Sequence, residues 1–284
     1  MSERYLIIGA GGQLGCALRA QYPQANVVDY SELNIADPDS IKQFDWSGYD
    51  VVFNAAAWTN VDAAEKLEHR EEVWRVNALG PWHLSQMAEK HDFTLFHIST
   101  DYVFNGEKDK YTEQDALSPL SVYGASKAAG DLAVSMLEKH YILRTSWVIG
   151  DGKNFVCTMM DLAQNGVSPK VVNDQKGRLT FTKELVRTID HLNTHQCEYG
   201  VYNMTGAGEA VTWHEVAQEI FSFCGRDKND VDGIPTAKYF KDQDNVALRP
   251  KNSTLDLTKI QSVGFTPADW RNDLQEYLET EGVI

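Results

Sequence analysis

The sequence predicts an α/β fold, with a doubly wound parallel sheet followed by a smaller C-terminal lobe. Short apolar runs alternate with helical patterns through the first half of the chain, and the first run, residues 4–8, enters a glycine-rich turn. A strand–helix–strand order builds a parallel sheet, because each connecting helix must cross back over one face of the sheet.

Strands are expected in the first half where apolar and β-branched residues form short runs between turn residues. These runs are residues 4–8, 25–28, 50–53, 93–98 and 141–145. Helical spacing of apolar residues predicts helices at 16–22 and 71–91. Ser121 is suited to cap a further helix that contains Tyr123, because a serine hydroxyl accepts a free N–H of the first turn.

The second half has a looser pattern, which predicts the smaller lobe. We expect helices at 154–164, 183–192, 212–223 and 267–281, strands at 170–172 and 200–203, and a polar segment at 225–233. The boundary is expected near Trp147. Residues 170–203 are expected to return to the first unit, which leaves 148–169 and 204–284 for the lobe.

Composition excludes several classes of protein. The net charge of −15 argues against nucleic-acid binding, and the polar start Met1–Arg4 is unlike a secretory signal. No apolar run approaches the roughly 18 residues of a membrane-spanning helix. The four cysteines, Cys16, Cys157, Cys197 and Cys224, are scattered without metal-binding spacing. We therefore expect a cytoplasmic protein without membrane contact, disulfide framework or metal.

The turn after the first strand has glycines at Gly9, Gly12 and Gly15, a G-x-x-G-x-x-G pattern. Glycine permits a tight turn and close backbone approach, so the amides that begin the next helix can face a pyrophosphate. A lone match is weak, because an ordinary turn also explains it. The position between a strand and a helix favours a dinucleotide site, which makes residues 1–147 the expected dinucleotide-binding domain.

Two further segments support a cofactor site. Asp29 ends the second strand, where a carboxylate can accept hydrogen bonds from the adenosine ribose, which favours NADH over NADPH. After the third strand, the small side chains of Ala55, Ala56 and Ala57 let a flat cofactor lie against the backbone. The residues assigned to the cofactor are Gly9, Gly12, Gln13, Leu14, Gly15, Asp29, Asn34, Ile35, Ala55, Ala56, Ala57, Tyr123 and Lys127.

Tyr123 and Lys127 stand four residues apart in a predicted helix and therefore share one face. The ammonium is expected to lower the pKa of the phenol and make it a proton relay for a carbonyl substrate. Thr100 ends the fourth strand, at the carboxyl edge of the sheet where ligands bind in such folds. Since the same spacing also occurs in plain helix packing, the position after the glycine turn is what favours catalysis.

These motifs resemble those of the extended short-chain dehydrogenase/reductases, which have a Rossmann-like fold. The resemblance extends to the dTDP-4-dehydrorhamnose reductase family through six short segments spread over nearly the whole chain. They are Gly12-Gln-Leu-Gly15, Asn54-Ala-Ala-Ala-Trp-Thr-Asn-Val-Asp62, Ser99-Thr-Asp-Tyr-Val-Phe104, Arg144-Thr-Ser-Trp-Val148, Asn173-Asp-Gln-Lys-Gly177 and Arg249-Pro-Lys-Asn-Ser253.

The resemblance implies reduction of the 4-keto group of dTDP-6-deoxy-L-lyxo-4-hexulose to dTDP-L-rhamnose by hydride from NADH or NADPH. It makes Tyr123 the proton donor, Lys127 a ligand of the nicotinamide ribose as well, and Thr100 the group that polarises the carbonyl. The implied partner is a dTDP-sugar. Its implied contacts are Thr59, Val61, Thr100, Asp101, Trp147, Arg249 and Asn252, although core packing or a solvated turn also explains several of them.

Two positions depart from the family pattern. Trp58 replaces a smaller aromatic residue or histidine and is expected near the nicotinamide, and Leu179 replaces a usual proline. Some family members form metal-held dimers, so a homodimer is one implied assembly, but the sequence offers no ligand set for a metal. Two other functions stay open. One is another sugar-nucleotide short-chain reductase or epimerase, and the other is a non-catalytic regulatory subunit resembling that of methionine adenosyltransferase.

Overall fold

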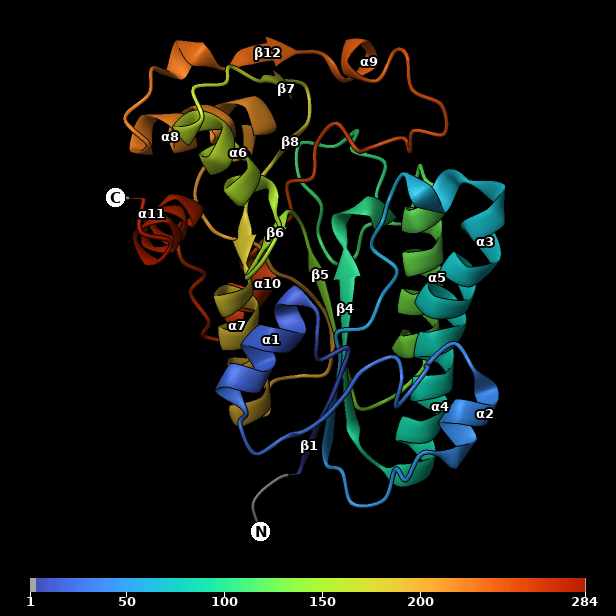
Figure 1. The fold of residues 1–284 in the computed structure, drawn as a ribbon. Helices are drawn as coiled ribbons and strands as arrows, with labels where there is room; N and C mark the ends of the chain where they lie inside the picture. Colours follow the sequence, from blue (N-terminus) through green and yellow to red (C-terminus); the bar gives the residue numbers. More distant parts are fainter. Residues whose placement is uncertain (1–3, 284) are drawn as a thin grey trace.

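The structure, a computed structural model, describes residues 4–283. Within them a parallel sheet of six strands has the order β2-β1-β3-β4-β5-β10 (Figure 1). The strands are β1 (Tyr5–Ile8), β2 (Asn26–Val28), β3 (Val51–Asn54), β4 (Thr94–Thr100), β5 (His140–Thr145) and β10 (Gly200–Asn203). The doubly wound α/β class is confirmed. The polar start of the chain, which is unlike a secretory signal, includes residues 1–3, and these lie outside the described residues.

Helices cover both faces of the sheet because alternate residues of a buried strand point to opposite faces. On β1, Ile7 packs toward one face, whereas Leu6 and Ile8 pack toward the other. The first face is covered by α1 (Gln13–Gln21) and α7 (Thr182–Thr194). The helices on the second side are α2 (Pro38–Gln43), α3 (Leu67–Trp74), α4 (Gly80–His91) and α5 (Val122–Ser135) (Figure 1).

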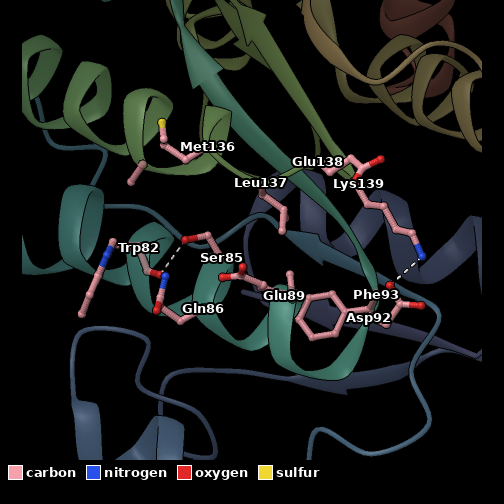
Figure 2. A pocket seen from close by; sticks show the side chains of 12 residues that line it. Trp82, Ser85, Gln86, Glu89, Asp92, Phe93, Met136, Leu137, Glu138 and Lys139 are labelled. Carbon is pink, nitrogen blue, oxygen red and sulfur yellow. Dashed lines mark hydrogen bonds and ion pairs between the residues drawn. The ribbon is translucent and has the colours of Figure 1, made fainter.

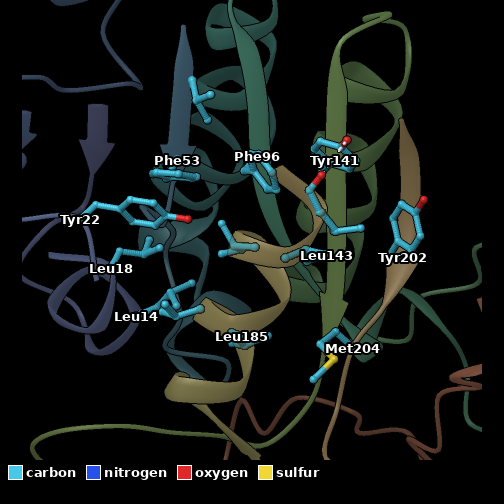
Figure 3. Packing of buried hydrophobic residues seen from close by; sticks show 14 of the residues in the cluster. Leu14, Leu18, Tyr22, Phe53, Phe96, Tyr141, Leu143, Leu185, Tyr202 and Met204 are labelled. Carbon is cyan, nitrogen blue, oxygen red and sulfur yellow. Dashed lines mark hydrogen bonds between the residues drawn. The ribbon is translucent and has the colours of Figure 1, made fainter. Parts of the chain in front are cut away.

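The core under α1 and α7 contains a row of aromatic rings that crosses the sheet (Figure 3). Ring centroids are 5.0 Å apart for Tyr22 and Phe53, 5.3 Å for Phe53 and Phe96, and 4.6 Å for Phe96 and Tyr141. Such contacts contribute beyond the burial of apolar area alone. Phe53, Phe96 and Tyr141 come from β3, β4 and β5, so their contacts hold these strands together and align the carboxyl ends of the strands.

The C-terminal lobe has its own apolar core, built on α6 (Phe155–Gln164), α8 (Trp213–Phe223) and α11 (Trp270–Thr280). Leu179 is fully buried in this core, so the leucine that replaces the usual proline fills it with apolar atoms. The lobe lies beyond the carboxyl edge of the sheet (Figure 1). Its strand pairs are β6 (Val148–Ile149) with β9 (Thr180–Phe181), β7 (Lys170–Val172) with β12 (Asp232–Ile234), and β8 (Lys176–Gly177) with β11 (Val211–Thr212).

Several elements differ from their expected bounds. The helix expected at 71–91 is divided by a π-helical turn, Arg75–Leu79, because Pro81 has no N–H to donate to the Asn77 carbonyl. α1 begins at Gln13 rather than residue 16, since Gly12 is its N-cap. Short elements escaped the sequence pattern because they span less than two turns, namely α2, α9 (Thr236–Tyr239) and α10 (Thr258–Ser262).

The chain crosses between the two units more than once after Trp147. β7 pairs with β12 in the lobe, whereas α7 and β10 lie with the central sheet. Ile260 of α10 also packs into the core of the sheet. The expected polar segment at 225–233 contains the start of β12 and a single helical turn, Lys228–Asp230. The division of the chain into a dinucleotide-binding domain and a substrate lobe stays a prediction.

Candidate active site

A cavity of about 500 Å³ opens at the carboxyl edge of the sheet. The ends of β4 and β5 and the segments that follow β1, β3, β4 and β5 line it, together with α5 and one residue each of α7 and α8. A second cavity of about 460 Å³ shares Gly12, Ala55, Ala56 and Ala57 with the first. The edge of the sheet where β2 and β3 lie on either side of β1 is where ligands bind in doubly wound folds.

Tyr123, Lys127 and Thr100 all line the larger cavity. The predicted cap is present, because Ser121 Oγ accepts the Gly124 N–H at 3.1 Å and begins α5 there. A Cβ at Gly124 would lie 2.3 Å from the Tyr102 carbonyl oxygen. Glycine at this position therefore lets α5 press against the chain that follows β4, which brings Tyr123 beside Thr100.

The ionisation of this pair differs from the expectation. Burial raises the pKa of the Tyr123 phenol, and the Thr100 hydroxyl opposes that effect. The net change in the phenol pKa is therefore upward and not the expected lowering, and the Lys127 ammonium donates to the Ile98 carbonyl oxygen at 2.5 Å. Burial lowers the pKa of Lys127 to about 8. A phenol with a raised pKa keeps its proton at neutral pH, which is the form a proton donor needs.

Asp101 supports Thr100 and is not a free carboxylate in the cavity. Thr100 Oγ1 donates to Asp101 Oδ1 at 3.0 Å, and the Ser253 hydroxyl donates to Asp101 Oδ2. Burial raises the pKa of Asp101 to about 6, although these two hydroxyls oppose the change. Asp101 therefore joins the segment after β4 to the C-terminal segment that carries Ser253.

Thr59, Val61 and Trp147, which the resemblance assigns to the sugar, line the same cavity. Trp147 has a left-handed backbone with φ of 49° and stacks on Trp213 at 3.8 Å between ring centroids. A non-glycine residue in this conformation costs free energy, and such strain is typical of functional sites. The stack holds the Trp147 ring in place as a flat apolar wall.

Arg249 and Asn252 stand outside the residues that line either cavity. Arg249 Nη2 pairs with Asp62 Oδ2 at 2.7 Å, and its guanidinium lies 4.8 Å from the centroid of the Phe240 ring. Asn252 Nδ2 donates to the carbonyl oxygens of Lys108 and Asp109 at 2.9 and 2.7 Å. Both side chains therefore fasten the C-terminal segment to the first domain.

The glycine turn has the close packing that its spacing suggests. Gly9 has φ of +80°, and a Cβ there would lie 2.7 Å from the Ala56 nitrogen. Gly15 is not part of either lining; a Cβ there would lie 2.2 Å from the Gly9 carbonyl oxygen. Of the other assigned residues, Asp29, Asn34 and Ile35 line the 460 Å³ cavity, and Gln13 and Leu14 line the larger one.

Several lining residues were not assigned to the site from the sequence, and one residue was expected elsewhere. Tyr102, Ser146 and Trp213 line the cavity, and Tyr102 meets the Tyr123 ring edge-on at 5.7 Å. Tyr102 and Ser146 lie inside segments that carried the resemblance, whereas nothing in the sequence connects Trp213 of the lobe with this site. Trp58 was expected near the nicotinamide. It lines the 460 Å³ cavity together with Asp29, and not the 500 Å³ cavity that Tyr123 lines.

A larger hollow, of about 590 Å³, lies along α4 and beside the C-terminal end of α5 (Figure 2). Met136 lies beside it at the end of α5 opposite to Tyr123. An ion pair, Lys139 with Asp92 at 2.7 Å, borders it at the surface. This hollow is far along the helix from the Tyr123 cavity and takes no part in the site.

Residues 4–283 contain no group of three or more His, Cys, Asp or Glu side chains arranged to hold a metal. The same part of the chain has no helix that is both long and apolar enough to span a membrane. The four cysteines are half-buried free thiols.

Comparison with known proteins agrees with this geometry. The family described as RmlD substrate binding domain matches residues 3–282. The dTDP-4-dehydrorhamnose reductase of Aggregatibacter actinomycetemcomitans is 40% identical over 293 residues, covering 96% of this chain and 97% of its own. The spore coat polysaccharide biosynthesis protein SpsK of Bacillus subtilis (strain 168) is 36% identical over 284 residues, covering 97% of each chain.

Among solved structures, a dTDP-4-dehydrorhamnose reductase from Bacillus anthracis str. Ames in complex with NADP has a TM-score of 0.90 and 31% identity. The match covers 99% of this chain and 100% of that one. The resemblance drawn from the sequence motifs is thereby confirmed. The chain belongs to the RmlD substrate binding domain family, that of the dTDP-4-dehydrorhamnose reductases.

Proposed function

We propose that this chain reduces the 4-keto group of dTDP-6-deoxy-L-lyxo-4-hexulose to dTDP-L-rhamnose with NADPH or NADH. The chain is an oxidoreductase of dTDP-rhamnose biosynthesis, a route toward cell-surface polysaccharide. One observation carries the proposal most directly: Tyr123, Lys127 and Thr100 share a cavity with the glycine turn. The names of the relatives supply the substrate class.

The residues of the glycine turn fit a dinucleotide. Gly12 gives no side-chain cap to α1, so the first amides of that helix remain available for a pyrophosphate. Neither Gly9 nor Gly15 has room for a Cβ, and the absence of side chains there keeps the backbone of the turn close to the ligand. When bound, the nicotinamide supplies a hydride to the carbonyl carbon of the sugar.

The protein supplies the proton. As negative charge develops on the sugar oxygen, Tyr123 donates its phenol proton to that oxygen. The Thr100 hydroxyl lies beside the Tyr123 phenol, while its single proton is directed to Asp101 Oδ1. We therefore assign Thr100 to aligning the phenol, in place of the expected polarisation of the carbonyl. Lys127 places its charge beside the nicotinamide ribose and the phenol.

The sugar nucleotide is assigned to the remaining wall of the cavity. Trp147 covers the apolar face of the deoxyhexose, and Thr59 and Val61 supply further contacts from the same cavity. Arg249 binds the diphosphate by exchanging its Asp62 partner for a phosphate oxygen. Asn252 supports the segment that carries Arg249.

Asp29 should set the choice of nicotinamide. Its Oδ1 accepts the N–H and hydroxyl of Ser31 at 3.0 and 2.8 Å, which lowers its pKa and leaves Oδ2 for a ribose hydroxyl. No lysine or arginine is among the described residues that line this cavity. We expect Asp29→Ala to weaken NADH binding about tenfold or more, and NADPH binding less, because a carboxylate also repels the 2′-phosphate.

Fluorescence titration of both nicotinamides measures this effect. Glu32→Gln is the matched control, since Glu32 lies in the same turn, accepts the Asp29 N–H at 3.2 Å and does not line the cavity. Equal losses for NADH and NADPH in Asp29→Ala would remove the assigned role.

Identification of the product tests the function itself. Purified protein is incubated with dTDP-6-deoxy-L-lyxo-4-hexulose and each nicotinamide, and the product is identified by chromatography and NMR. Formation of dTDP-L-rhamnose with stoichiometric loss of NADPH or NADH supports the proposal. Reduction only of another nucleotide sugar in a substrate panel would favour the second reductase or epimerase reading. No turnover of any keto sugar would favour the non-catalytic regulatory subunit.

The cellular location and the oligomeric state of the enzyme are proposed as well. We place it in the cytoplasm, where nicotinamides are supplied and the four free thiols stay reduced. A homodimer is the proposed assembly on the strength of the resemblance, and light scattering after size exclusion measures it directly. A monomeric mass at working concentration would refute the homodimer.

A further inference from the structure

Behind the cavity, α5 carries a third buried ionisable residue that the proposed reaction does not use. Tyr123, Lys127 and Asp131 follow at intervals of four residues and therefore lie on one face of α5. The Lys127 and Asp131 side chains are each only 2% exposed. Burial of a carboxylate is costly unless it is paired, so the partners of Asp131 indicate what it does.

Asp131 has cations on two sides. Its Oδ2 accepts a hydrogen bond from Arg144 Nε of β5 at 3.0 Å, and Lys127 lies one turn earlier on the same helix. Arg144 is also held independently of Lys127. Its Nη1 donates to the Glu113 carbonyl oxygen at 3.2 Å, and its guanidinium lies 5.3 Å from the centroid of the Phe104 ring. The buried carboxylate is therefore in direct contact with Arg144, and the buried Lys127 lies one helical turn away from it.

The other carboxylate oxygen of Asp131 faces His97 of β4. Asp131 Oδ1 and His97 Nε2 are 3.9 Å apart, and neither atom has a hydrogen-bond partner within residues 4–283. Asn54 Oδ1 accepts the Ala56 N–H at 3.2 Å, so the Asn54 amide donates to His97 Nδ1 at 3.1 Å. This assigns the imidazole proton to Nε2, which points it at Asp131.

We propose that Asp131 is a positioning residue, the counter-ion that keeps Lys127 protonated in its buried place beside the cofactor site. The inference rests on the role proposed above for Lys127. The titratable groups around that ammonium are Tyr123 and Asp131 on α5, His97 on β4, Asp101 after β4 and Arg144 on β5. Among them His97 is neutral, Arg144 has the same charge as Lys127, and Asp101 is engaged with Thr100 and Ser253.

The ionisation of the cluster agrees with this geometry. Burial lowers the pKa of Lys127 to about 8, and Asp131 opposes that change. Burial raises the pKa of Asp131, and Arg144 and Lys127 oppose it in turn. Loss of the carboxylate should therefore lower the pKa of Lys127 further. Loss of the Arg144 guanidinium should raise it, because the carboxylate then serves Lys127 alone.

Two substitutions in the same ion pair test the proposal, since they should act in opposite directions. In Asp131→Asn the alkaline limb of the pH profile of kcat/KM should move about one pH unit or more toward neutral pH. In Arg144→Gln it should move toward higher pH. A purely structural ion pair would give both variants the same loss, without opposed shifts. Asp131→Glu retains the charge and should restore the wild-type limb.

The pH dependence of NADPH affinity, followed by nicotinamide fluorescence, is the second measurement. It needs no ketone, so it tests Asp131 even if the wild-type protein fails to reduce the proposed sugar. Circular dichroism confirms that each variant is folded, and Arg144→Gln serves if Asp131→Asn does not fold, because a limb that stays in place or moves toward lower pH in that variant would also overturn the proposal. A limb that stays in place in folded Asp131→Asn would overturn the proposal. Shifts in the same direction in Asp131→Asn and Arg144→Gln would also overturn it.

Discussion

Replacing Tyr123 with phenylalanine should lower kcat by about 10²–10⁴-fold and leave NADPH affinity nearly unchanged. The substitution removes the phenol proton and keeps the ring, which occupies the cavity beside Thr100. Because burial raises the pKa of Tyr123, the wild-type phenol should stay protonated across neutral pH. Steady-state kinetics and cofactor titration, carried out on the same preparation, separate the two effects.

Tyr102→Phe is the matched control for this experiment. Tyr102 lines the same cavity and meets the Tyr123 ring at 5.7 Å, and burial raises its phenol pKa as well. We expect removal of the Tyr102 hydroxyl to change kcat by only a few-fold, which is the effect expected from losing a single interaction. An unchanged kcat in Tyr123→Phe, together with a large loss in Tyr102→Phe, would transfer the proton-donor role to Tyr102.

Gly15→Ala should both destabilise the protein and weaken cofactor binding. A Cβ at Gly15 would lie 2.2 Å from the Gly9 carbonyl oxygen and 2.8 Å from Ala10 backbone atoms, all of them in the turn proposed to bind the pyrophosphate. Backbone atoms cannot swing aside as a side chain can, so the turn itself must shift. Overpacking of this kind costs about 1–3 kcal/mol of unfolding free energy. Urea denaturation and NADPH titration measure the two losses.

Gly11→Ala in the same turn provides the control. A Cβ at Gly11 would have no atom within 4 Å, so the added methyl group points into open space. We expect its unfolding free energy to match that of the wild type. If Gly11→Ala and Gly15→Ala lost the same stability, a clash present only at Gly15 could not be the cause, and close packing at Gly15 would be refuted.

The order of strands and helices in the central sheet was predictable because its signals are local. Apolar runs mark β1 and β5, and the Ser121 hydroxyl marks the start of α5. The glycine spacing and the Tyr123–Lys127 spacing are local in the same sense. Short elements such as β6 and β8 were not predictable, since two residues carry no period and exist only through their partners.

Contacts between distant segments were beyond the reach of the sequence. The motif around Arg249 indicated a cation near the diphosphate, but its pairing with Asp62 depends on how the C-terminal segment folds back. Trp213 reaches the cavity from the lobe only because it stacks on Trp147. The expected lowering of the Tyr123 pKa was wrong for a related reason, because burial, which depends on the folded chain, raises that pKa.

By itself the sequence determined the fold class, the family and the residue types of the site, because spacing along a helix and turn chemistry are properties of neighbouring residues. Only the tertiary structure decided which charges share a buried space. Asp131, Arg144 and His97 come from α5, β5 and β4, and they meet because parallel strands and a crossover helix bring them together. In that water-poor setting the protonation of Lys127 depends on its neighbours, and no local pattern encodes them.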